Sequence, residues 1–128
     1  MQRADHYRRF FLVAAAFNFA IAAALSLAPG WFFPLLGMPV PQERVTLDLF
    51  CGAVALFGLQ YLWVASNPGR HAELIALGAI GKTAVFVILA IHWRVVGDAT
   101  GKMVALAVVD LAFAAAFVKI LWTMRHDD

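Results

Sequence analysis

The chain has 128 residues, of which 63% are hydrophobic and 14% charged, and its mean hydropathy is +0.80. Soluble domains average about 45–50% apolar and about 25% charged residues, so this composition argues against an ordinary soluble domain. The formal net charge of +2, without a basic stripe interleaved with aromatic residues, argues against nucleic-acid binding. Cys51 is the single cysteine, which excludes an intrachain disulfide and a multi-cysteine metal site.

Four apolar segments account for this composition, and we expect helices over residues 10–28, 46–66, 73–93 and 102–124. Each segment has roughly 19–23 residues, enough to span a hydrocarbon core of about 30 Å at 1.5 Å per residue. The first segment is longer than the apolar part of a signal peptide, about 7–15 residues, so we expect a retained helix. The sequence therefore predicts an all-α fold, an integral membrane four-helix bundle with antiparallel up-down helices, forming one domain over residues 1–128.

The stretch between the first two helices, residues 29–41, is apolar and aromatic but too short to cross a membrane. Its prolines prevent a long helix. We expect it to lie in the membrane interface, with Trp31 at the level of the lipid headgroups. The alternative is a flap over a lateral opening between helices.

The basic residues predict an orientation in the membrane. The N-terminus, the second loop and the C-terminal end carry Arg3, Arg8, Arg9, Arg70, Lys119 and Arg125. The first and third loops carry Arg44, Arg94 and Lys102. By the positive-inside rule, both termini are expected in the cytoplasm.

Lys82 is the most informative residue, because it lies in the middle of the third apolar segment. A lysine at the centre of a membrane helix costs about 2.5–3.5 kcal/mol on insertion scales, so it should face a partner or a water-filled cavity. Counting 1.5 Å per residue from the outer ends of the segments places Asn18, Lys82 and Asp110 at depths of about 15, 16 and 12 Å. We therefore expect these three side chains to form one buried polar network, in which Asp110 pairs with Lys82.

Three further polar residues are weaker members of this candidate site. Asp48 lies near the outer interface, four residues after Arg44, and we expect these two to pair on the helix surface. Gln60 lies on the inner side of the midplane, and His92 lies at the outer end of the third helix. An end residue of this kind is more often solvated than catalytic.

The polar network has two interpretations, which the sequence leaves open. A buried ion pair with an amide can fix which helices meet and in which register. Ionisable groups at membrane depth are also, by default, candidates for ion, proton or ligand sites.

Four stretches carry a resemblance to a known family: Leu47–Gly52, Phe57–Leu62, Leu77–Lys82 and Val109–Phe113. Together with the hydropathy and the number of helices, they resemble small bacterial four-helix membrane proteins of the DoxX-like kind, most of which have no known function. The resemblance implies a four-helix bundle in the bacterial inner membrane. It implies no activity and no catalytic residues.

The chain contains no His-Glu-x-x-His motif, no Gly-rich phosphate loop and no nucleophile elbow. We therefore expect neither cofactor nor metal, and binding or assembly rather than catalysis. The expected protein is an accessory subunit of a larger membrane complex or homo-oligomer, or a binder of a lipophilic small molecule, surrounded by membrane lipid and without nucleic acid.

Two alternatives remain. The first is an enzyme acting on a lipid or sterol-like substrate, similar to emopamil-binding-type isomerases, in which Asp110 and Lys82 move a proton. The second is a small proton-coupled transporter. A bare face on the first helix, with Ala14, Phe17, Ile21 and Ala24 at helical spacing, would favour the subunit, although ordinary lipid contact is its simpler explanation.

Overall fold

The computed structural model describes residues 2–126, and within this range the chain is helical and has no strand. The long helices are α1 (Gln2–Leu27), α3 (Arg44–Ser66), α4 (Ala72–Ile91) and α5 (Gly101–His126). The short ones are α2 (Pro29–Leu35), the 3₁₀ turn η1 (Pro68–Arg70) and the π-helical turn η2 (His92–Val96), which continues α4. By length and composition, four helices of the described chain can cross a membrane, as the sequence predicts.

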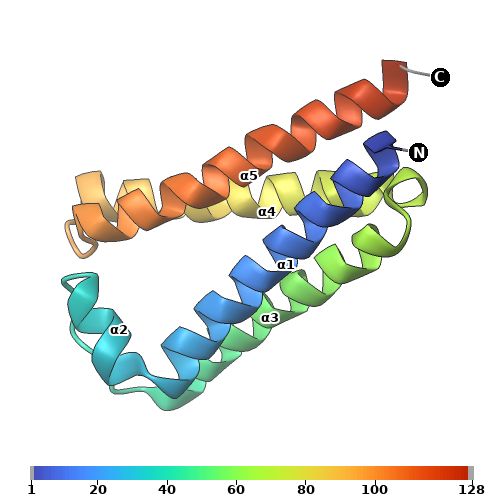
Figure 1. Cartoon of the computed structure of the whole chain (residues 1–128). Coiled ribbons are helices and arrows are strands. Elements are labelled where there is room, and N and C mark those ends of the chain that lie inside the picture. Colours follow the sequence, from blue (N-terminus) through green and yellow to red (C-terminus); the bar gives the residue numbers. More distant parts are fainter. Residues whose placement is uncertain (1, 127–128) are drawn as a thin grey trace. The chain divides into compact units, whose positions relative to one another are not determined.

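The chain divides into two compact units, residues 1–70 and 71–128. In the first unit, α1 and α3 pack side by side (Figure 1). The ring centroids of Phe11 and Tyr61 are 6.5 Å apart, and Asn18 is hydrogen-bonded to the carbonyl of Val54. Because residues early in α1 meet residues late in α3, these two helices form a hairpin.

The second unit is built in the same way from α4 and α5 (Figure 1). Lys82 of α4 contacts Asp110 of α5, and a Cβ atom placed on Gly101 would lie 3.7 Å from the ring of Trp93. The connection between the helices turns at Gly97, whose φ of +86° is readily available only to glycine. The one-domain prediction for residues 1–128 concerns both hairpins together and stays a prediction.

The core of the first unit shows which face of α1 is buried. Its buried residues recur at intervals of three and four, which is the spacing of one helix face: Phe11, Ala14, Ala15, Asn18, Ala22 and Leu25. Ala14 is completely buried, so it does not belong to the bare face that would favour a subunit. Exposed residues on this helix include Leu12, Ala16 and Phe19. Both faces of α1 are apolar, so helical spacing in the sequence gives the period of the core but not which face is buried.

Helix α1 also begins at Gln2, well before residue 10, where the apolar segment starts. Hydropathy marks where a segment enters the membrane and not where the backbone becomes helical. Arginine is a good helix former, so the helix continues through the charged residues that precede Phe10.

Helix α2 follows α1 almost immediately and is short, as its prolines predict. Pro29 is accommodated in the first turn of α2, and the helix ends at Leu35, before Gly37 adopts a φ of +71°. Phe33 is buried in a small core with Leu25 of α1 and Leu47 of α3, whereas Trp31 on the same helix is exposed. One aromatic ring thus anchors the segment to the hairpin and leaves another at the surface. Its position in the membrane interface stays a prediction.

Candidate functional site

The candidate site is an ion pair between the two helices of the second unit. Helix α4 buries one face, formed by Ile75, Gly78, Ala79 and Lys82, and Lys82 is the charged residue on it. Its Nζ lies 2.7 Å from Oδ1 of Asp110 on α5, and it donates a hydrogen bond to that oxygen. The exposed fractions of the two side chains are 5% for Lys82 and 18% for Asp110. The expected pairing of these residues is therefore present, and it is well shielded from the surroundings.

An aromatic ring completes the surroundings of the lysine. The Nζ of Lys82 lies 4.9 Å from the ring centroid of Phe113, within the range of a cation–π interaction. Phe113 follows Asp110 by three residues, so both side chains lie on neighbouring positions of the same helix face. The sequence reasoning missed this contact, although the spacing from Asp110 is the signal that could have revealed it.

Small residues allow the close approach of α4 and α5 around this pair. Gly78 and Ala79 on α4 are buried, as are Ala107 and Ala114 on α5. Glycine and alanine let helix backbones come together in a membrane, where packing rather than the hydrophobic effect drives association. The ion pair is thus set among small side chains of its own two helices.

Asn18, the third expected member of the network, has a partner within its own unit. It is buried on α1, and its Nδ2 donates a hydrogen bond of 3.1 Å to the carbonyl of Val54 on α3. This bond crosses the first hairpin as the Lys82–Asp110 bond crosses the second. A network that joins Asn18 to Lys82 and Asp110 stays a prediction.

Asp48 pairs with Arg44, as expected, and both belong to a larger cluster at the end of α1. The Arg44 Nε lies 3.1 Å from Oδ1 of Asp48, and Ser26 Oγ donates a hydrogen bond of 3.1 Å to the same oxygen. Arg44 also donates to the backbone carbonyl of Ser26. The last carbonyls of a helix lack partners within it, so this cluster caps the C-terminal end of α1 and ties it to α3. The role of Ser26 was not predicted from the sequence.

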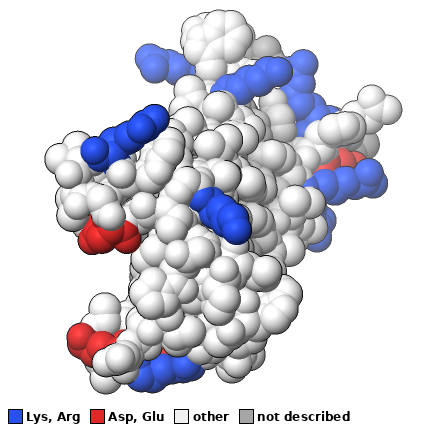
Figure 2. Space-filling view, turned by 90° about the vertical axis from the view of Figure 1, so that its left-hand side faces the viewer, with Lys and Arg blue, Asp and Glu red and all other residues white. Residues whose placement is uncertain are grey.

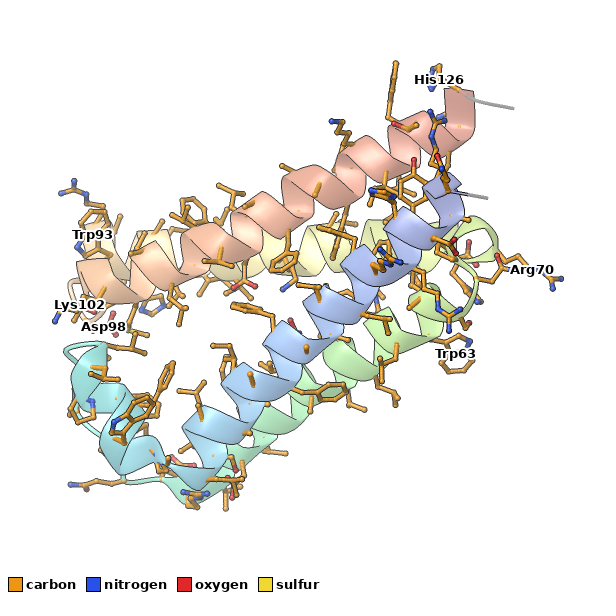
Figure 3. The ribbon with its side chains drawn as sticks, viewed as in Figure 1. Trp63, Arg70, Trp93, Asp98, Lys102 and His126 are labelled. Carbon is orange, nitrogen blue, oxygen red and sulfur yellow. The ribbon has the colours of Figure 1, made fainter. Side chains whose placement is uncertain are left out.

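His92 lies in the connection between α4 and α5, as its position in the sequence suggests. Its Nδ1 is 2.7 Å from Oδ1 of Asp98, and the exposed fractions of the two side chains are 45% and 60%. The neighbouring Arg94 stacks over the ring of Trp93, with 4.1 Å between its Cζ and the ring centroid. Figure 3 shows Trp93, Asp98 and Lys102 together at this end of the hairpin.

His92 and Gln60 are the remaining candidates. His92 follows Lys82 by about 15 Å along the helix axis, too far to act on the same group. Gln60 is half-buried on α3. Within residues 2–126, no three or more His, Cys, Asp or Glu side chains are placed to hold a metal ion. In the same range, every buried side-chain nitrogen and oxygen has a hydrogen-bond partner.

Neither a known protein family, nor a curated protein, nor a solved structure matches this chain. The resemblance to DoxX-like proteins therefore stays a prediction.

Proposed function

We propose that this chain is a non-catalytic, multi-pass protein of the bacterial inner membrane that serves as an accessory subunit of a larger membrane assembly. The observation that carries the proposal is the 2.7 Å bond between Lys82 and Asp110. An ionisable group at membrane depth is usually a candidate for a ligand or proton site. Here the ammonium and the carboxylate satisfy each other inside one helical hairpin.

A pair of this kind supports a structural role because it specifies how α4 and α5 meet. Moving one helix by a single residue relative to the other would shift Nζ by about 1.5 Å along the axis and weaken the bond. Phe113 and the small residues around the pair add to the same contact. We propose that the pair sets the register of the hairpin, and that the outer faces of the helices contact lipid and partner subunits.

The basic residues support an orientation for this protein. We propose that all four long helices run up and down through one bundle with both termini in the cytoplasm. Arg8, Arg9 and Arg70 would then lie on the cytoplasmic side, and Arg44, Arg94 and Lys102 on the opposite side, in accordance with the positive-inside rule.

Native mass spectrometry of the full chain, gently extracted from its own membrane, tests the proposed function. We expect co-purifying protein subunits in fixed ratio and no tightly held small molecule. The matched variants are Lys82→Met, at the buried pair, and Lys102→Met, at an exposed lysine in the first turn of α5.

A retained lipid-sized mass that Lys82→Met loses and Lys102→Met keeps would overturn the proposal. The cluster would then be a ligand site, and an isomerase-type enzyme would become the better hypothesis. A chain that co-purifies with no other protein at its native expression level would also contradict an accessory role.

A further inference from the structure

Three arginines of the first unit present exposed positive charge. Arg8 and Arg9 are exposed on the first turns of α1, and Arg70 is exposed at the end of η1. None of the three forms an ion pair within residues 2–126. Within the described chain, Asp5, the acidic residue in the first turn of α1, is not ion-paired with Arg8 or Arg9. In contrast, Arg44 is bound to Asp48, and Arg94 is stacked on Trp93.

The fold brings these arginines to one end of the hairpin although they are far apart in the sequence. The segment η1 packs against α1 as well as against the end of α3, and Pro68 within it is buried. Arg70 is therefore held beside the α1–α3 hairpin at the end where α3 finishes, and Arg8 and Arg9 belong to the start of α1, which lies at the same end. Figure 3 shows Arg70 and Trp63 at this end.

The level of these side chains corresponds to the boundary of the apolar core. Phe11 is completely buried against Tyr61, so the packed apolar layer starts directly after Arg9. Trp63, with an exposed fraction of 62%, is two residues from Tyr61 along α3. Tryptophan is enriched where a membrane helix passes from hydrocarbon to headgroups. Arginines one turn beyond that level are within reach of lipid phosphates.

We propose that Arg8, Arg9 and Arg70 form a docking site for the phosphate groups of anionic phospholipids. The planar guanidinium group offers two parallel N–H donors to a phosphate, which makes arginine well suited to such a ligand. Basic clusters next to a membrane helix are attracted to anionic lipid surfaces. Figure 2 views the side away from Arg70, where charged side chains form separate groups on a surface that is otherwise mostly uncharged. The proposal rests on the membrane location in the proposed function, but not on the accessory role.

Lipid binding to the full chain in a zwitterionic detergent tests this site, with fluorescent phosphatidylglycerol as the probe and phosphatidylcholine as the comparison. Each basic residue near a membrane surface contributes about 1 kcal/mol, which corresponds to about a fivefold change in affinity. We expect phosphatidylglycerol to bind preferentially. Exchanging two arginines, in Arg8→Gln with Arg70→Gln, should weaken its binding about 25-fold. Binding should also weaken with added salt.

A double exchange in η2 and the first turn of α5, Arg94→Gln with Lys102→Gln, removes the same charge elsewhere and should leave the affinity nearly unchanged. If both double variants lost the same affinity for phosphatidylglycerol, net charge alone would explain the binding, and the proposed site would be overturned. Equal affinity for phosphatidylcholine, or complete displacement by millimolar inorganic phosphate, would also overturn it. Circular dichroism of each variant checks folding. Arg8→Lys with Arg70→Lys keeps the charge but loses the paired N–H donors, so we expect it to bind more weakly than the original chain and more tightly than the double glutamine variant. A chain that stays in the membrane fraction without preferring phosphatidylglycerol would refute this site and leave the accessory role standing.

Discussion

Lys82 and Asp110 stabilise the second hairpin only while both are present. Exchanging Lys82 for methionine keeps a long apolar side chain but leaves the carboxylate of Asp110 without its 2.7 Å partner. Breaking a buried ion pair by removing one member costs about 3–5 kcal/mol, and the partial exposure of Asp110 favours the lower end. We expect Lys82→Met to lower the free energy of unfolding by about 3 kcal/mol, measured by denaturant unfolding in mixed micelles.

The double variant distinguishes an ion pair from two independent sites. Replacing the pair by apolar residues, as in Lys82→Met with Asp110→Leu, removes both charges together and is often nearly neutral. We expect it to recover most of the stability that Lys82→Met loses. Losses that simply add would show that the two residues act independently, contrary to the geometry.

The residues of this pair were recognisable in the sequence because charge is rare in an apolar segment. Lys82 and Asp110 are conspicuous for that reason, and helix geometry places them at similar depths. Phe113 and Ser26 were missed, since a phenylalanine or serine in such a chain is ordinary until its neighbour is known. Asn18 shows that the partner of a polar residue can be equally hard to predict. Its burial could be expected, but its hydrogen bond to the Val54 carbonyl involves a backbone atom, which every residue has.

Helix α1 packs closely against α3 at Gly58. A Cβ atom at this position would lie 3.1 Å from the ring of Phe19 and 3.3 Å from Cβ of Asn18, so the neighbours would have to move. At Gly52, on the same helix, an added Cβ atom would meet nothing within 4 Å. These two glycines therefore form a matched pair for measuring how much close packing contributes to the first hairpin.

Gly52→Ala is expected to stabilise the protein, because alanine is favoured over glycine within a helix by about 0.5–1 kcal/mol. Gly58→Ala gains the same helix preference but overpacks the contact, and overpacking typically costs about 1–3 kcal/mol. We expect Gly58→Ala to be less stable than Gly52→Ala by about 1–2 kcal/mol, measured by thermal unfolding in detergent. If the two variants were equally stable, the ring of Phe19 would be moving aside without cost, and the packing at Gly58 would not hold the helices together.

The helices themselves were predictable, while the buried face of α1 was not. Segments of apolar residues of membrane-spanning length gave α3, α4 and α5 to within a few residues, and the prolines of residues 29–41 limited α2 to a short helix. A soluble helix reveals its buried face by contrast with a polar one. In α1, Leu12 on the exposed side is as apolar as Leu25 in the core, so the contrast is lost. Which side of such a helix packs depends on small residues and shape, which are resolved only by the partner helix.

The orientation in the membrane is the property that connects the charge distribution with the proposed function. Cys51 is buried, so Cys51→Ala provides a background without a native thiol. In that background, Gly69→Cys places an exposed thiol on the proposed cytoplasmic side, and Gln42→Cys places one between α2 and α3 on the opposite side. A maleimide that cannot cross the inner membrane should label Gln42→Cys in intact cells and Gly69→Cys only after the inner membrane is permeabilised. The opposite pattern would invert the orientation, because the basic end of the first hairpin would then face away from the cytoplasm. Labelling of both positions in intact cells would contradict a membrane-spanning α3, since these two residues flank that helix.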